Sequence, residues 1–206
     1  GGGTPTKDNL SFWENGTIPW ISPKDMKTFW LENSKDKITE AAVRESSTGY
    51  IEPNNLIMVV RSGILQRTIP IAINQVRVTL NQDMKALMFN NLLKVEYAAN
   101  FIKGNESSLL LELSKEGATV ESIEQEYLRR CLFTIPPSDE QTKINQFLSK
   151  KTKTYSELIN KSIYQINLLK ERRTALISAA VTGKIDLRDW QAPQEQNAKV
   201  LVGQEA

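Results

Sequence analysis

The sequence predicts an α+β protein in which a strand-rich mixed domain is followed by one long, coiled-coil-forming α-helix. Two patterns predict it. In residues 1–136, short apolar and β-branched runs alternate with turn formers, which is typical of buried strands. Residues 139–181 contain neither glycine nor proline, and apolar side chains recur there at heptad spacing. The expected units are a domain at 1–137, a helix at 138–184 and a polar tail at 185–206.

The first domain divides into expected strands and helices. The strands are the apolar runs at residues 17–22, 56–60, 69–73, 84–89 and 132–135. Ser34 is expected to cap a short helix that ends near Glu45. A second helical segment is expected at 92–113, with an interruption around Gly104-Asn105. Glu52-Pro53-Asn54-Asn55 predicts a turn, and Gly117-Ala118-Thr119 predicts a loop.

The long helix is bounded by start and stop signals. Ser138 follows Pro136-Pro137 and is expected to cap the helix, with Gln141 three residues later completing a capping box. Gly183 lies just past the expected end, where glycine commonly ends helices. At 1.5 Å per residue, such a helix is about 65 Å long.

An apolar seam follows this helix over five heptads. Of the ten positions in two heptad series, seven are apolar or aromatic, as a coiled coil requires. Ser162 and Arg173 interrupt the seam and are expected to weaken it or to fix its register. The seam residues expected to pair are Leu148, Tyr155, Ile159, Ile166, Leu169 and Leu176. Two readings stay open at this point: the helix pairs with a partner helix, or it packs back on its own domain.

Composition excludes several classes of chemistry. The chain has no histidine, which removes Ser-His-Asp and Cys-His catalysis and the commonest metal ligand. Cys131 is the single cysteine and has apolar neighbours, so we expect a packed, inert thiol and a cytoplasmic, reducing location. No run approaches the roughly 18 apolar residues of a membrane span. No phosphate loop, methyltransferase motif, metal site or catalytic constellation is recognisable, which favours a non-catalytic binding or scaffold protein.

Charge is distributed unevenly along the chain. The formal net charge is +2, but residues 1–142 carry −3, residues 143–184 carry +7 and residues 185–206 carry −2. The basic residues of the helix form either a solvated face or a contact with phosphates or an acidic protein.

Motifs at both ends of the long helix resemble one family. They are Ile135-Pro136-Pro137-Ser138-Asp139-Glu140-Gln141, Leu168-Leu169-Lys170-Glu171-Arg172-Arg173 and Val181-Thr182-Gly183-Lys184-Ile185-Asp186. They resemble the conserved region of the specificity (S) subunits of type I restriction–modification systems. The first domain is similar to a target recognition domain of that family, with these motifs in the expected order: Gly2-Gly3-Thr4-Pro5, Ile18-Pro19-Trp20-Ile21, Arg61-Ser62-Gly63, Asn81-Gln82-Asp83 and Gly117-Ala118-Thr119.

The resemblance implies half of a subunit, because a full S subunit resembles two such units in tandem. Family recognition domains begin somewhat earlier than Gly-Gly-Thr-Pro, so an N-terminal piece is expected to be missing. The implied function is non-catalytic: sequence-specific recognition of one half of a bipartite target on double-stranded DNA. The implied partners are modification (M) subunits, restriction (R) subunits, and a second S half or a second copy of this chain as a homodimer; no membrane is implied.

The same resemblance implies that the chain holds no cofactor, and that S-adenosylmethionine binds the M subunit. From family architecture, M subunits are expected to dock near the junction of domain and helix and near the helix end, at Pro136, Glu140, Gln141 and Lys184. The alternative function is a coiled-coil assembly scaffold, or a silent or decoy specificity cassette, without DNA readout.

Candidate DNA contacts follow the ends of two expected strands. Gly63 allows close approach of a backbone, and arginine and glutamine side chains can read guanine and adenine edges by bidentate bonds. The expected DNA-binding residues are Ser22, Lys24, Lys27, Arg61, Ser62, Gly63, Gln66 and Arg67. Each has a plain alternative as an ordinary surface side chain. The net charge of −3 on residues 1–142 argues against phosphate binding. Residues 54–82 offset this charge locally, because they hold three arginines and no acid.

Overall fold

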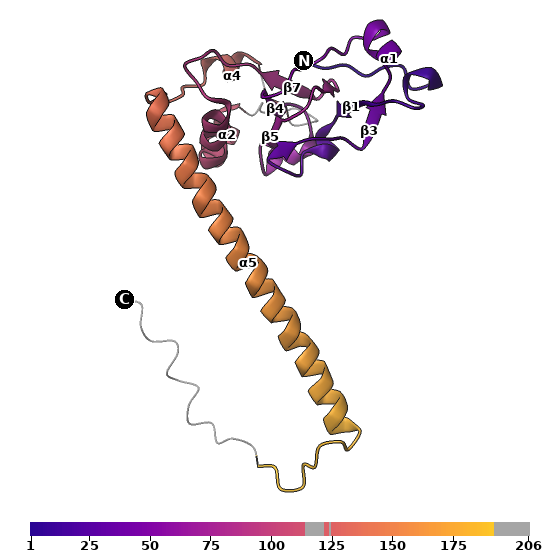
Figure 1. The fold of residues 1–206 in the computed structure, drawn as a ribbon, viewed down its shortest axis with the longest axis vertical. Coiled ribbons are helices and arrows are strands. Elements are labelled where there is room, and N and C mark those ends of the chain that lie inside the picture. The colour runs from indigo at the N-terminus through magenta and orange to yellow at the C-terminus, as the bar shows by residue number, and fades with distance from the viewer. Residues whose placement is uncertain (114–121, 124, 192–206) are drawn as a thin grey trace. The chain divides into compact units, whose positions relative to one another are not determined.

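The computed structural model describes residues 1–113, 122–123 and 125–191 (Figure 1). The chain forms two compact units, Gly1–Ser149 and Lys150–Ala206. The first unit ends beyond the predicted boundary at 137 because Gln141 and Asn145 of the long helix are buried within it. Strands and short helices make up the first unit and a long helix follows, so the predicted α+β class is confirmed.

The smaller of two sheets is built around β1 (Ile18–Ile21). It is flanked by β3 (Asp36–Ile38) on one side, which is antiparallel to it, and by β6 (Thr79–Leu80) on the other, which is parallel. Helix α1 (Glu40–Glu45) packs against this sheet. A small apolar cluster holds it together, made of Phe12, Ile18, Trp20, Ile38 and Ala42.

The larger sheet carries the main core. Its strand order is β2-β5-β4-β7, with β2 (Trp30–Leu31), β5 (Ile71–Asn74), β4 (Leu56–Val59) and β7 (Met84–Leu87). Every residue of β4 and β5 is buried, which explains why both read as continuous apolar runs rather than alternating ones.

Helices cover this sheet on one side. Helix α2 (Val95–Gly104) contacts β4 and β5, and α3 (Glu106–Leu113) and α4 (Gln125–Arg130) follow it. The expected helical segment at 92–113 and its interruption are therefore confirmed, whereas α4 was not expected. The expected loop at Gly117-Ala118-Thr119 and residues 192–206 of the expected tail lie outside the described residues.

The expected helix from Ser34 to Glu45 is wrong in its first half. Residues 36–38 form β3 instead, because Ile38 pairs with Ile18 and is fully buried there. The helix starts after Thr39, whose hydroxyl accepts a hydrogen bond from the Ala42 N–H at 3.3 Å. Pairing with a neighbouring strand overrides local helix preference in this segment.

The expected strand at 132–135 is also wrong. Among the residues that the structure describes, this segment has no ladder partner, and side chains anchor it to α2. The rings of Phe133 and Phe101 lie 4.5 Å apart, and the Tyr97 hydroxyl donates to the Thr134 carbonyl at 2.9 Å. Its apolar residues are therefore explained by packing against a helix, which periodicity alone does not distinguish from a strand.

The long helix is confirmed as α5 (Ser138–Val181). Gly183 ends it in the left-handed region, with φ at 72°, and the Lys184 N–H bonds to the Ala179 carbonyl at 2.8 Å. The expected capping box is not formed: the Gln141 side chain bonds to Lys94, Leu92 and Pro136 instead. Among the described helices, none has both the length and the apolarity needed to cross a bilayer.

Candidate nucleic-acid interface

An open groove of about 840 Å³ lies on the first unit. Its walls come from the N-terminal segment, from β1 and the turn after it, from the start of β3, from Ser62 beyond β4 and from the 81–83 turn between β6 and β7. The polar side chains that line it include Thr4, Lys7, Ser22, Lys24, Ser62 and Gln82. Segments far apart in the sequence thus present hydrogen-bond donors, acceptors and cations on one concave surface.

Two tryptophans stiffen one wall of this groove. Trp13 and Trp20 pack edge to face, with ring centroids 5.2 Å apart. The Trp20 indole N–H donates to the Gly3 carbonyl at 2.9 Å, and the Trp13 indole N–H donates to the Thr6 carbonyl at 3.1 Å. The tryptophans therefore fix the N-terminal segment against β1.

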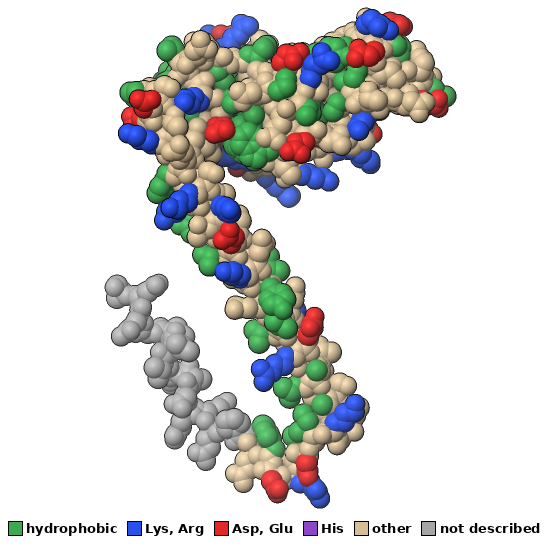
Figure 2. Space-filling view, in the orientation of Figure 1, with side chains coloured by type: hydrophobic (Ala, Val, Ile, Leu, Met, Phe, Trp, Pro, Cys, Tyr) green, Lys and Arg blue, Asp and Glu red, His purple; other side chains and the backbone are tan. Residues whose placement is uncertain are grey.

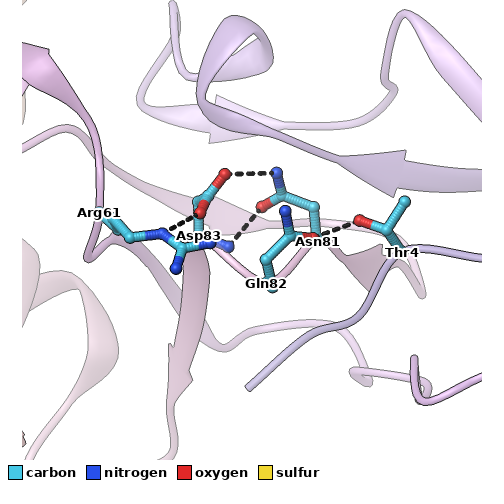
Figure 3. A network of polar contacts seen from close by, with 5 residues as sticks. All are labelled: Thr4, Arg61, Asn81, Gln82 and Asp83. Atoms are coloured by element: carbon cyan, nitrogen blue, oxygen red, sulfur yellow. Dashed lines mark hydrogen bonds and ion pairs between the residues drawn. The ribbon is translucent and has the colours of Figure 1, made fainter. Parts of the chain in front are cut away.

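A polar network joins the 81–83 turn, which lines the groove, to Thr4 and to Arg61, and Arg61 itself is not part of the groove lining (Figure 3). The Arg61 Nε donates to Asp83 Oδ1 at 2.6 Å. Asp83 Oδ2 accepts from the Asn81 amide at 3.2 Å, so the carboxylate lies between arginine and asparagine. The Thr4 hydroxyl donates to the Gln82 side-chain oxygen and ties the N-terminal segment to the same turn.

Ser22 and Ser62 line the groove, but their hydroxyls cap local turns. The Ser22 hydroxyl is buried and donates to Asp25 Oδ2 at 2.8 Å, at the start of the 3-10 helix Pro23–Asp25. The Ser62 oxygen accepts from the Ile64 N–H at 3.5 Å, at the start of the 3-10 helix Gly63–Gln66. The hydroxyls of both serines therefore hold the local turns that form the groove wall.

The other predicted DNA contacts fall into two groups. Lys24 lines the groove and also an adjacent hollow that contains Lys27. Gln66 and Arg67 are exposed but are not part of the groove lining. At Gly63, an added methyl group would meet no described atom within 4 Å, so the fold itself does not require glycine there.

Among the groove residues that were not predicted as contacts are Thr4, Lys7, Gln82 and Asp83. Three of them lie in the motifs that carry the family resemblance, but no spacing rule marked them as contacts. The register of the sheet is the missing information. Val59 pairs with Met84 in the β4–β7 ladder, so Arg61 and Asp83 lie next to each other just beyond that pair.

The groove has mixed charge. Lys7 and Lys24 are balanced by Asp36 and Asp83 among the lining residues. Arg77, one of the three arginines in the acid-free stretch, lies over the Tyr50 ring at 4.3 Å and is not part of the groove lining. The groove therefore offers directional hydrogen bonds more than a strong positive field.

Cys131 lines a separate apolar cavity of about 180 Å³ between the larger sheet and its helices. Burial raises the pKa of its thiol, and the nearby Glu112 carboxylate raises it further. The thiol therefore stays protonated at neutral pH and is a poor nucleophile.

Comparison with known proteins assigns the chain. The model of the family described as "Type I restriction modification DNA specificity domain" matches residues 1–168. The chain belongs to this family. It is 44% identical over 150 residues to the type I restriction enzyme EcoR124I/EcoR124II specificity subunit of Escherichia coli. The matched residues cover 73% of this chain and 37% of that protein.

A second relative of this specificity domain is the type I restriction enzyme MjaIX specificity subunit of Methanocaldococcus jannaschii. It is 28% identical over 152 residues, covering 72% of this chain and 34% of the relative. The chain thus spans about a third of the length of the curated relatives it matches.

Solved structures support the same fold. A chain from the structure "Structural basis underlying complex assembly and conformational transition of the type I R-M system" gives a TM-score of 0.68 at 16% identity, over 87% of this chain and 42% of that one. The HsdS subunit from Thermoanaerobacter tengcongensis gives a TM-score of 0.57 at 15% identity, over 76% of this chain and 35% of that one. The resemblance drawn from the helical motifs is confirmed at the level of family and fold.

Within the specificity domain, the residues predicted to dock M subunits differ in accessibility. Glu140 and Lys184 are exposed, and Pro136 is half-buried. Gln141 is fully buried: its Oε1 accepts from the Lys94 N–H at 2.9 Å, and its Nε2 donates to the Leu92 and Pro136 carbonyls at 2.8 Å each. Gln141 therefore fixes the start of α5 to the specificity domain and is not a surface contact, which corrects the prediction for this residue.

The predicted seam residues of α5 are largely exposed. Leu148, in the first unit, is half-buried, whereas Tyr155, Ile159, Ile166, Leu169 and Leu176 have exposed fractions between 50% and 64%. Figure 2 shows hydrophobic side chains recurring along α5. Ile163 and Ile177, which are also exposed, lie on the same helix face by their spacing from Ile159 and Ile166. An exposed apolar stripe of this length is typical of a helix that pairs with another helix.

Proposed function

We propose that this specificity domain reads one half of a bipartite DNA sequence and holds modification subunits on it. The observation that carries the proposal is the groove, in which cations and hydrogen-bonding side chains from segments far apart in the sequence converge in a chain of the specificity family. Lys7 and Lys24 are suited to phosphates, which position a protein on DNA. Arg61 and Gln82 have the donors and acceptors that base edges require.

The chain itself supplies no chemistry to the DNA in this proposal. Methyl transfer, with S-adenosylmethionine as donor, belongs to M subunits, and cleavage belongs to R subunits, both working with the chain in the cytoplasm. The mixed charge of the groove fits this division, because subunits that enclose the DNA supply the general attraction that the groove lacks. The exposed Glu140 and Lys184 and the half-buried Pro136 remain the proposed docking residues, without Gln141.

The exposed stripe of α5 is proposed to pair with a second S half or a second copy of this chain. The helix has 44 residues and is therefore about 66 Å long. Two such rods side by side set a fixed separation between two recognition domains, and half-sites read from one side of the duplex recur about every 34 Å. If both chains are identical, the two-fold axis makes the target an interrupted palindrome.

A binding experiment with the M subunit tests the proposal. The complex is mixed with randomised duplexes in a gel-shift assay, and bound sequences are recovered. We expect enrichment of one split motif by the wild-type chain, and a loss of enrichment for Lys24→Ala combined with Arg61→Ala. Arg44→Ala, which removes an exposed cation outside the groove, is the matched control and should leave the motif unchanged. Equal binding of all duplexes, or none, would instead favour the coiled-coil scaffold.

A further inference from the structure

Arg61 is held by an acid in a way that leaves part of its guanidinium available. Its Nε donates to Asp83 Oδ1 at 2.6 Å, and its side chain remains 53% exposed. No described residue bonds the two terminal nitrogens, Nη1 and Nη2, so among the described residues this edge of the exposed guanidinium has no partner, next to the groove-lining residues Ser62 and Asp83. Two parallel N–H groups at such an edge match the O6 and N7 acceptors of guanine in the major groove.

Asp83 is itself fixed before any ligand arrives. Its Oδ2 accepts from the Asn81 amide at 3.2 Å, and its backbone N–H donates to Asn81 Oδ1 at 3.0 Å. Its backbone carbonyl accepts from the Val60 N–H at 2.8 Å, next to Arg61 in the chain. The carboxylate therefore has one orientation, and a guanidinium bonded to it loses little further freedom on binding.

The ion pair also changes what Arg61 contributes to binding. A lone arginine attracts every phosphate, whereas an arginine paired with a carboxylate has little net charge and gains little from counterion release. Its remaining value lies in directional bonds. The pair thus favours discrimination between bases over general affinity.

We propose that Arg61 is a specificity-determining residue that reads a guanine through its Nη1–Nη2 edge, and that Asp83 is the positioning residue that orients it. The inference rests on the proposed DNA-reading function and deepens it by naming the base and the residue that sets the geometry. Asp83 touches no DNA in this arrangement; it acts through Arg61.

Asp83→Asn tests the positioning role with a predicted sign. Removing an acid beside DNA strengthens binding to all duplexes if the carboxylate acts only by repulsion. If Asp83 positions Arg61, the preference for G·C at one position of the half-site falls by about 10-fold, while preferences at other positions stay. The assay measures dissociation constants of the complex with the M subunit for duplexes carrying each base pair at each position.

Three further variants complete the design. Arg61→Ala should remove the same G·C preference, and the double variant should lose no more than Arg61→Ala alone, because both act through one contact. Asp83→Glu, which keeps the carboxylate, should restore part of the preference. Arg61→Lys keeps the charge and leaves the 81–83 turn intact, so its loss of the same preference tests the fork geometry even if Asp83 variants fold poorly.

The outcomes separate this inference from the proposed function. A wild-type complex without any sequence preference overturns the proposed function and the inference with it. A selective wild-type complex whose G·C preference survives Arg61→Lys or a folded Asp83→Asn overturns the inference alone. Uniformly tighter binding by Asp83→Asn at every position assigns the carboxylate to simple repulsion and also overturns it.

Discussion

Gln141 gives the sharpest test of how the specificity domain holds its helix. The side chain is fully buried and makes hydrogen bonds to Lys94, Leu92 and Pro136. Gln141→Ala removes the three bonds and leaves one backbone N–H and two carbonyls without their partner. A single unsatisfied buried group costs about 1–3 kcal/mol. Because relaxation and entering water recover part of the sum, we expect a loss of about 3 kcal/mol of unfolding free energy.

The measurement is urea unfolding of the full chain, followed by circular dichroism and by tryptophan fluorescence. Fluorescence reports chiefly on the first unit, which holds Trp13, Trp20 and Trp30. The control is Lys143→Ala, which changes an exposed side chain two residues further along the same helix. Gln141→Glu is the isosteric test: it keeps an acceptor for the Lys94 N–H but turns a carboxylate oxygen toward two carbonyls, so it should destabilise at least as much as alanine at neutral pH. A Gln141→Ala chain within about 0.5 kcal/mol of the control would refute the reasoning.

Two further predictions concern the half-buried carboxylate of Glu106 and the α5 seam. Partial burial of Glu106 opposes ionisation, but hydrogen bonds from the Thr68 hydroxyl and the Ile69 N–H, together with Lys103, lower the pKa of Glu106 below its ordinary value. Its contribution to the free energy of unfolding is therefore present above the ordinary carboxyl pKa of about 4.3 and is lost as the pH falls through the lowered value. In chemical unfolding, Glu106→Gln should lower the free energy of unfolding by about 1–2 kcal/mol at pH 7 and by far less at pH 3. A difference that does not change with pH would contradict this prediction. Replacing Ile159 and Ile166 by Asp should abolish self-pairing in light scattering, whereas Asn160→Asp, off the seam, should not; an unchanged dimer would rule out the seam.

The sequence predicts the extended elements well where one local signal dominates. The buried strands at Leu56–Val59 and Ile71–Asn74 follow from continuous apolar runs, and α5 follows from the absence of glycine and proline between two clear boundaries. The two failures have a common cause. Residues 36–38 and 132–135 take their conformation from partners distant in sequence, and local propensity does not contain that information.

The candidate site was predicted in part for the same reason. Arg61 and Lys24 could be chosen because each follows a strand, the usual position of a functional loop. Asp83 could not be linked to Arg61 without the β4–β7 register, which places residues of opposite charge side by side. Gln141 shows the opposite error: a residue chosen from the family motif as a surface contact is an internal tether, because burial depends on the path of residues 92–94.

Methylation mapping tests the central claim most directly. The chain is co-expressed with its M subunit in a host that lacks other methyltransferases, and modified positions are mapped across the genome. The account predicts that modification falls in one split motif with an unread spacer of fixed length, and that Arg61→Ala relaxes a single G·C position of it. Two results would contradict the claim that this domain reads DNA sequence. One is modification without a shared motif. The other is a shared motif that neither Arg61→Ala nor any substitution of a groove-lining residue changes.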